Sequence, residues 1–179
     1  MAAPLVAIAQ DLESWALKPA REAGDVSILP VLYKNRAAKL QLCHSSSPMR
    51  VLSEPAGYNG AERKTLLLSH GDAARTIAPI LAHLRQLLQT NGTDVSNWKT
   101  PELPSLGEGP PALRCKLLPN TEYYDANGQR TTEPTEWRDL LVTPIVAISC
   151  FAGEATGAAL TIVALQIQGR HEKRSWTFA

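Results

Sequence analysis

The sequence is poor in cysteine, in aromatic residues and in long apolar runs, and each shortage excludes a class of protein. Only three of the 179 residues are cysteine, and Cys43, Cys115 and Cys150 form no Cys-x-x-Cys pair. We therefore expect buried reduced thiols in an intracellular protein, cytoplasmic or nuclear, rather than a disulfide-bonded secreted domain. The longest apolar stretch, residues 140–152, is interrupted by polar residues and falls short of the roughly 20 residues that a membrane-spanning helix needs.

Targeting signals and membrane partners are not expected either. The apolar run near the N-terminus has no lysine or arginine before it, and Asp11 and Glu13 follow it. A secretory signal has the opposite arrangement, with basic residues ahead of the apolar run. We expect this segment to form a short helix or a loose arm.

Motifs that mark catalytic and nucleotide-binding sites are absent as well. The sequence contains no glycine-rich phosphate loop, no Gly-x-Ser-x-Gly elbow and no His-Glu-x-x-His pair. The string Ser69-His70-Gly71-Asp72 sets a histidine beside an acid, but capping of a following helix by Asp72 accounts for it. We predict a protein that is not an enzyme, with no catalytic residue, no metal site and no cofactor.

The ordinary composition, by contrast, predicts one soluble domain. Hydrophobic residues make up 44% and charged residues 20% of the chain, close to the average of globular proteins, and the length suits a single core. We expect residues 1–25 to form the N-terminal arm or short helix, 26–170 a β-rich core domain with a proline-rich loop at 93–111, and 171–179 a basic and aromatic tail.

One segment has the periodicity of a long amphipathic helix. From residue 72 to residue 91, isoleucine and leucine recur on one face at helical spacing, while arginine, histidine and glutamine fall mostly on the other. Gly92 follows as a stop signal, and Pro79 would fit in a first turn. The pattern predicts a helix over about 72–91 that packs its leucine face on a sheet.

Most other apolar segments alternate as strands do. An Asn127-Gly128 pair between short alternating segments is the strongest hairpin signal in the chain. We expect two longer antiparallel strands at 140–151 and 158–168, and further strands at 26–33, 38–43, 49–53, 65–69 and 113–118. This order predicts a mainly β, α+β fold: an antiparallel barrel or sandwich with one long amphipathic helix.

Basic side chains gather beside aromatic ones, although the net charge is only +1 and aromatic residues make up only 6% of the chain. Binders of single-stranded nucleic acid need this pair of ingredients, because cations follow the phosphates while flat rings stack on the bases. The candidate phosphate contacts are Arg36, Lys39, Arg63, Lys64, Arg170, Lys173 and Arg174, and the candidate stacking rings are those of Tyr33, Tyr58, Trp98 and Trp176. Solvated turns and a core-packed Trp176 explain the same residues without a ligand.

The layout of the segments carries a resemblance. Pro48-Met49-Arg50 precedes a glycine-containing loop, a strand at 66–69, the helix at 72–91 and Trp98, and later come Thr143-Pro-Ile-Val-Ala-Ile148 and Leu165-Gln166-Ile167. This order resembles that of the single-stranded DNA-binding proteins with OB-like barrels found in bacteriophages and large DNA viruses. The nearly neutral charge and the lack of an acidic tail depart from that pattern.

The resemblance implies an OB-like barrel that binds single-stranded DNA or RNA in a groove, without metal or chemistry. It implies a role in DNA replication, recombination or repair, inside the host cell if the source is viral, and a possible homo-oligomer. Two other functions stay open: a structural or assembly subunit of a virion or larger complex, and a hydrolase that uses His70 and Asp72.

Overall fold

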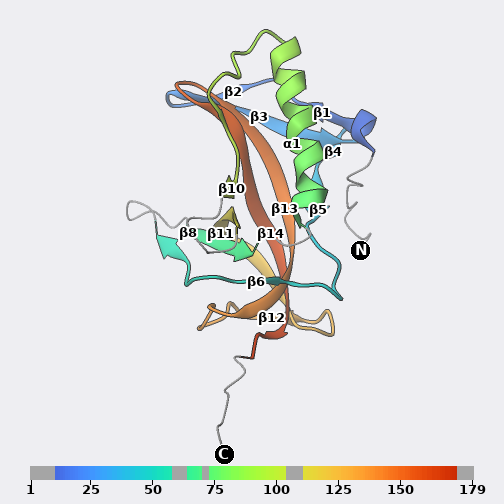
Figure 1. Ribbon diagram of the computed structural model, residues 1–179, viewed down its shortest axis with the longest axis vertical. Helices are drawn as coiled ribbons and strands as arrows, with labels where there is room; N and C mark the ends of the chain where they lie inside the picture. The colour runs from blue at the N-terminus through green and yellow to red at the C-terminus, as the bar shows by residue number, and fades with distance from the viewer. Residues whose placement is uncertain (1–10, 58–63, 70–72, 104–110, 173–179) are drawn as a thin grey trace, which may run out of the picture.

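The computed structural model describes residues 11–57, 64–69, 73–103 and 111–172, and β-strands dominate these ranges (Figure 1). A short 3-10 helix, η1, and one long α-helix accompany the strands. The elements in chain order are η1 (Leu12–Ser14), β1 (Trp15–Leu17), β2 (Arg21–Ala23), β3 (Val26–Tyr33), β4 (Arg36–Ala37), β5 (Lys39–Gln41), β6 (Met49–Arg50), β7 (Ala56–Gly57), β8 (Lys64–Ser69), α1 (Ala73–Thr90), β9 (Trp98–Lys99), β10 (Glu102–Leu103), β11 (Ala112–Tyr124), β12 (Arg130–Thr131), β13 (Leu140–Ala152) and β14 (Thr156–Arg170).

Two of the three longest strands, β13 and β14, form an antiparallel hairpin at the centre of the sheet (Figure 1). The hairpin was predicted from two apolar segments joined by a glycine-containing turn. The sheet continues on either side of it, in the order β1-β3-β13-β14-β11-β8-β7. The mainly β fold with one helix is therefore confirmed.

The expectation of a purely antiparallel barrel is wrong in two respects. The sheet is mixed, because β11 and β9 both run parallel to β14. The chain reverses from β11 into β12, keeps that direction through β13 and reverses again into β14, so β14 points along β11. The barrel is also not closed: an isolated bridge between Val51 and Leu68, rather than a ladder, links the segment after β6 to β8.

Residues 11–25, the described part of the segment expected as an N-terminal arm or short helix, contribute to the sheet. Within this segment, η1 leads directly into β1, which pairs antiparallel with the second half of β3. β2 pairs with the first half of β3. Pro30 lies between these two pairings, where its missing N–H costs no ladder hydrogen bond to β1 or β2.

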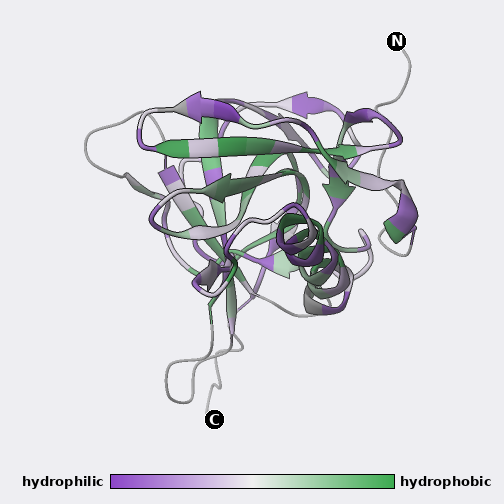
Figure 2. Ribbon diagram, turned by 90° about the horizontal axis from the view of Figure 1, so that it is seen from above, coloured by the Kyte–Doolittle hydropathy of each residue, from purple (hydrophilic) through white to green (hydrophobic). Residues whose placement is uncertain are grey.

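The helix α1 lies beside the sheet, and Figure 2 shows it almost end-on. Its apolar face is buried as the leucine spacing predicts, through Ile77, Ile80, Leu81, Leu84 and Leu88. Its end is set by Gly92, whose φ of 84° is open to glycine, and by the hydrogen bonds that Gly92 and Thr93 donate to the carbonyls of Gln89 and Leu88. We had expected Pro79 in the first turn of the helix, but it lies inside the helix.

Two local predictions concern turns. The Asn127-Gly128 hairpin is confirmed, because β11 pairs with β12 across it and Gly128 has a φ of 78°. The proline-rich stretch at 93–111, expected as a loop, contains the short strands β9 and β10. These pair with β14 and β11, which fastens this stretch to the sheet.

The core is one cluster of buried side chains, to which α1 and the inner face of the sheet both contribute and which joins residues from Trp15 to Leu165. Cys115 and Cys150 belong to it, and burial raises the pKa of each thiol to about 12. Cys43 is half-buried, and burial raises the pKa of its thiol as well. All three cysteines are free, and none forms a disulfide.

Candidate nucleic-acid interface

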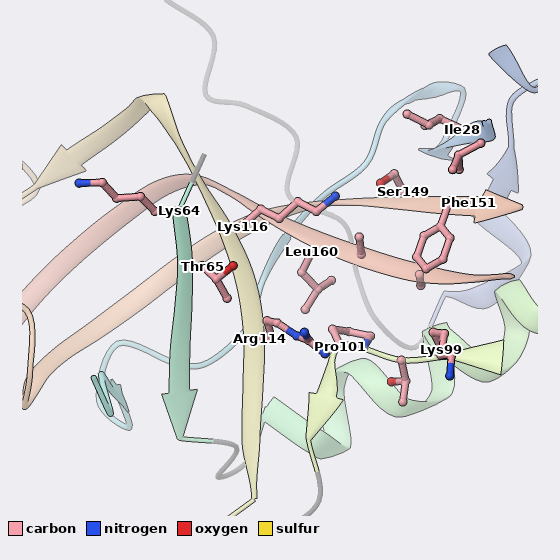
Figure 3. A pocket seen from close by; sticks show the side chains of 14 residues that line it. Ile28, Lys64, Thr65, Lys99, Pro101, Arg114, Lys116, Ser149, Phe151 and Leu160 are labelled. Atoms are coloured by element: carbon pink, nitrogen blue, oxygen red, sulfur yellow. The ribbon is translucent and has the colours of Figure 1, made fainter. Parts of the chain in front are cut away.

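A groove of about 570 Å³ lies on the face of the sheet that points away from the core (Figure 3). We call it the basic groove, because four of its lining side chains are cationic: Lys64, Lys99, Arg114 and Lys116. None of the described residues that line it is acidic. β3, β8, β9, β11, β13 and β14 all contribute to its walls.

Strand alternation explains why β11 supplies two of these cations. Successive side chains of a strand point to opposite faces, and Leu113, Cys115 and Leu117 are buried in the core. Arg114 and Lys116 therefore point to the outer face, where both are exposed. Lys116 is paired in register with Thr65 of β8 on one side and Thr161 of β14 on the other, so its cation stands above small hydroxyl side chains.

Lys99 reaches the basic groove because a glycine lets β9 approach β14 closely. Gly157 pairs in register with Lys99 on one side and Phe151 on the other. A Cβ atom at Gly157 would lie 2.3 Å from the Lys99 carbonyl oxygen and 2.8 Å from Cζ of Phe151. No side chain fits there. The glycine thus places a cation and a half-buried aromatic ring at the same end of the basic groove.

The basic groove offers a polyanion what it needs. Cations of one sign around a concave surface raise the local positive potential even when the whole chain is nearly neutral. Phe151 adds an aromatic ring, and Thr65, Thr100 and Ser149 add hydroxyl groups that can hydrogen-bond to phosphate or sugar oxygens.

The structure brings Lys39, a predicted phosphate contact, onto the same outer face. Lys116, Thr161, Ala147 and Lys39 stand in one register row across β11, β14, β13 and β5. Three strand spacings of about 4.8 Å separate the two lysines, or roughly 14 Å. Lys39 therefore adds one further cation to the outer face, beside the basic groove.

Other predicted residues lie at varying distances from this face. Lys64 lines the basic groove directly. Trp98 precedes Lys99 in β9, but its half-buried ring packs against the core and holds β9 in place. Arg36 is exposed on β4, at the edge of β3, and does not line the basic groove.

Tyr33, predicted as a stacking ring, is a core residue that is only 2% exposed. Its ring packs on Trp15 with centroids 5.4 Å apart, and its hydroxyl donates a hydrogen bond to Asp11. Hydrogen bonds from Ser14 and then Tyr33, with the charge of Lys34, hold the pKa of Asp11 below its usual range. A ring covered in this way has no face for a base, so we leave Tyr33 out of the candidate site.

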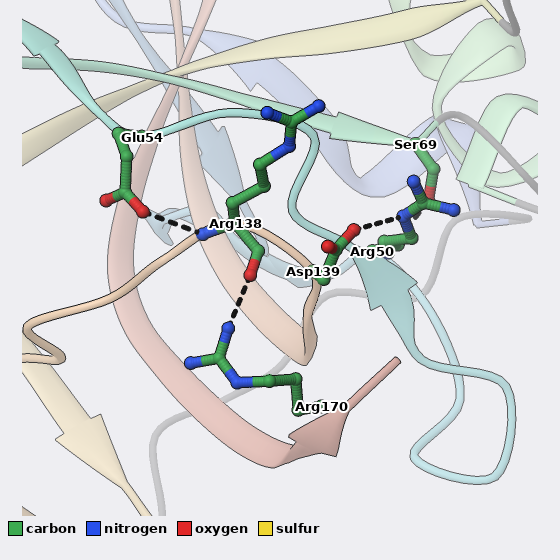
Figure 4. A network of polar contacts seen from close by, with 6 residues as sticks. All are labelled: Arg50, Glu54, Ser69, Arg138, Asp139 and Arg170. Carbon is green, nitrogen blue, oxygen red and sulfur yellow. Dashed lines mark hydrogen bonds and ion pairs between the residues drawn. The ribbon is translucent and has the colours of Figure 1, made fainter. Parts of the chain in front are cut away.

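Arg170, predicted as a phosphate contact, braces the opposite end of β14 (Figure 4). Its guanidinium donates to the backbone carbonyls of Arg138 and Glu136. At about 3.3 Å per residue, it lies up to roughly 35 Å along the strand from Ala159 in the basic groove. The structure thus separates Arg170 from the cations on β8, β9 and β11.

The same end of the sheet contains a polar network that is structural (Figure 4). The Glu54 carboxylate accepts hydrogen bonds from the backbone N–H groups of Trp137 and Arg138, at 3.0 and 3.1 Å. Arg50 Nε lies 3.0 Å from Asp139 Oδ1, an ion pair whose orientation falls short of hydrogen-bond geometry. These contacts fix the loop between β12 and β13.

Several predicted residues lie outside the described residues. They are Tyr58, Arg63, Lys173, Arg174 and Trp176 among the nucleic-acid contacts, and His70 and Asp72 of the alternative hydrolase site. Within the described ranges, no three histidine, cysteine or acidic residues come together as a metal site. No helix in the same ranges is long and apolar enough to cross a membrane.

Four residues of the basic groove were missed from the sequence: Lys99, Arg114, Lys116 and Phe151. The alternation Leu-Arg-Cys-Lys-Leu at 113–117 carried a signal for two of them, since it sets both cations on the face opposite the core. Lys99 and Phe151 had no local signal, because the strand register brings them together from distant positions.

No protein-family profile and no curated protein matches the sequence. Among solved structures, the C-terminally truncated single-stranded DNA-binding protein of bacteriophage Enc34 matches with a TM-score of 0.53 and 12% identity, over 88% of this chain and 97% of that one. The untruncated Enc34 protein matches with a TM-score of 0.52 and 10% identity, over 89% and 93% of the two chains.

A structure of the Enc34 protein in complex with single-stranded DNA matches with a TM-score of 0.51 and 12% identity, over 89% of this chain and 98% of that one. Sequence identity at this level is informative about architecture alone. The chain therefore has the fold of a bacteriophage single-stranded DNA-binding protein, as the order of its segments predicted.

Proposed function

We propose that this protein binds single-stranded DNA without regard to sequence and is not an enzyme. The observation that carries the proposal is the basic groove, in which Lys64, Lys99, Arg114 and Lys116 line one concave surface and no described lining residue is acidic. The shared fold adds support, since one of the matching proteins has a structure in complex with single-stranded DNA.

The groove suits a flexible single strand. Its cations neutralise phosphates, which every sequence presents alike, and Phe151 offers a ring to whichever base lies above it. We place this activity in DNA replication, recombination or repair, because single strands are exposed in those processes. Lys39 extends the phosphate contacts beyond the basic groove along the outer face.

Titration of labelled oligonucleotides at several salt concentrations tests the proposal. Each phosphate contact to a single strand contributes about −0.7 to the slope of log Kobs against log salt concentration. Four groove cations predict a slope of about −3, and Lys99→Ala or Arg114→Ala should make it shallower by about 0.7. Lys18→Ala is the matched control, because Lys18 is exposed and does not line the basic groove. Absence of binding at low salt contradicts the proposal, as does equal loss in the Lys18 variant.

A further inference from the structure

A second hollow, of about 200 Å³, lies on the outer face of the sheet farther along β14. We call it the distal hollow. Two register rows build it: Gln41 with Ile145 and Ala164, and Thr143 with Gln166 and Tyr124. These rows belong to the same strands that carry Lys39 and Lys116, so the distal hollow continues the face on which the basic groove lies.

Tyr124 presents a held ring at the distal hollow. Its hydroxyl donates a hydrogen bond of 2.8 Å to Glu122, and the Arg130 guanidinium lies 5.8 Å from the ring centroid. Arg130 also forms an ion pair with Glu122, at 3.3 Å. These contacts orient the half-buried ring before any ligand arrives, so little side-chain entropy is lost when a flat group stacks on it.

The walls of the distal hollow are uncharged and mainly apolar, and Gln41 and Gln166 add amide groups to them. The Gln41 amide nitrogen donates to the Cys43 carbonyl at 2.8 Å, and that of Gln166 donates to the Asp125 carbonyl at 3.2 Å. Both amides are thereby oriented, and no described residue donates to their oxygens, which can accept hydrogen bonds from the amino groups of a base. Ala164 contributes only a methyl group to the lining, which leaves room above it for a ligand.

The basic groove and the distal hollow differ in the charge of their lining residues and therefore suit different ligands. The basic groove has four lining cations, whereas the distal hollow has no charged lining residue, and the nearby carboxylate of Glu122 is paired with Arg130. A phosphate gains little in a hollow that has no lining cation and whose neighbouring cation, Arg130, is already paired with Glu122. An uncharged, flat group with polar edges fits it, and a nucleobase has that chemistry.

We propose that the distal hollow is a nucleobase subsite in which a base of the bound single strand stacks on Tyr124. This rests on the proposed function, because the base belongs to the strand whose phosphates lie in the basic groove. Between the two depressions the bound DNA passes over Thr161 of β14, which lies between Lys116 and Lys39 in the register row. From Ala159 to Gln166 the path covers roughly 23 Å along β14, within reach of sites that span about 4 to 16 nucleotides.

Binding of a normal oligonucleotide and of an oligonucleotide with abasic sites, to the same variants, tests the subsite. Tyr124→Ala should weaken binding of the normal strand by about 5- to 150-fold, the range for one stacked base. The same change should matter little for the abasic strand, which keeps every phosphate and lacks the stacking partner. The salt slope should stay at the wild-type value, because no cation has been removed.

Tyr124→Phe is the matched control, since it keeps the ring and should keep most of the affinity. If Tyr124→Ala does not fold, Tyr124→Leu keeps apolar volume without a flat face and should show the same loss. Equal affinity of the wild type and Tyr124→Ala for the normal strand overturns the subsite while the proposed function stands. Equal loss on normal and abasic strands also overturns it. Failure of the wild type to bind either strand overturns the proposed function instead.

Discussion

At the scale of single residues, the basic groove depends on Gly157 because no side chain fits at this position. A Cβ atom at this position would lie 2.3 Å from the Lys99 carbonyl oxygen, so β9 must move away if the glycine is replaced. We expect Gly157→Ala to displace Lys99 and to make the salt slope of DNA binding shallower by about 0.7, as Lys99→Ala does.

Gly157→Ala and Lys99→Ala both remove the phosphate contact of Lys99. The variant that carries both changes should therefore lose hardly more affinity for DNA than either single variant. Gly57→Ala is the control, since a Cβ atom at Gly57 meets nothing within 4 Å. Additive losses in the double variant would show that Gly157 acts elsewhere.

Two tyrosines illustrate what a residue type alone leaves undecided. Tyr33 and Tyr124 each end a β-strand and each hydrogen-bond a carboxylate through the hydroxyl. Trp15 covers the ring of Tyr33, whereas the ring of Tyr124 stands at a hollow in the outer face. Sequence reasoning selected Tyr33 and passed over Tyr124, because the partner that buries a ring comes from another strand.

At the scale of elements, predictions succeeded where the signal is local. The strand at 26–33 and the helix near 72–91 follow from periodicity, and the hairpin at Asn127-Gly128 follows from a turn pair. β9 and β10 have two residues each, too few for any period, and exist because β14 and β11 offer them partners. Lys99 and Phe151 of the basic groove were missed for the same reason, because pairing between distant strands brings them there.

The helix α1 allows a test at this scale, because Pro79 is an exposed interior residue that has no N–H to donate to the carbonyl of residue 75. Pro79→Ala should restore that hydrogen bond and raise the free energy of unfolding by about 2 kcal/mol, after allowing for the freer unfolded chain. Urea unfolding followed by circular dichroism measures the change. Ala82 is also exposed in α1, and Ala82→Gly should lower the free energy of unfolding by about 1 kcal/mol. An unchanged urea midpoint for Pro79→Ala would refute the expectation.

At the scale of the whole molecule, the buried thiols of Cys115 and Cys150 predict how stability changes with pH. Each has a pKa of about 12 in the folded protein, against an ordinary value of 9.0, because burial disfavours the thiolate. The folded state therefore holds these protons more tightly than the unfolded state. Their contribution is complete below pH 9 and is lost as the pH rises from about 9 toward 12.

Denaturant midpoints measured from pH 8 to 11 should fall, and Cys115→Ala should fall less steeply than the wild type while being less stable at pH 8. Burial also raises the pKa of Tyr123 to about 12, so this residue contributes to the same decline. Identical pH profiles for the wild type and the cysteine variant would contradict the expectation.

The parallel pairing of β11 with β14 has a consequence for how the protein is made. The walls of the basic groove come from residues as far apart as Val26 and Leu160, and β14 lies between β11 and β13 in the sheet. Such long-range contacts make folding slow, and a growing chain on the ribosome has no groove until β14 has emerged. The proposed ability to hold a polyanion should thus appear only when β14 has emerged and paired with β11 and β13, with no half-formed site to capture nucleic acid earlier.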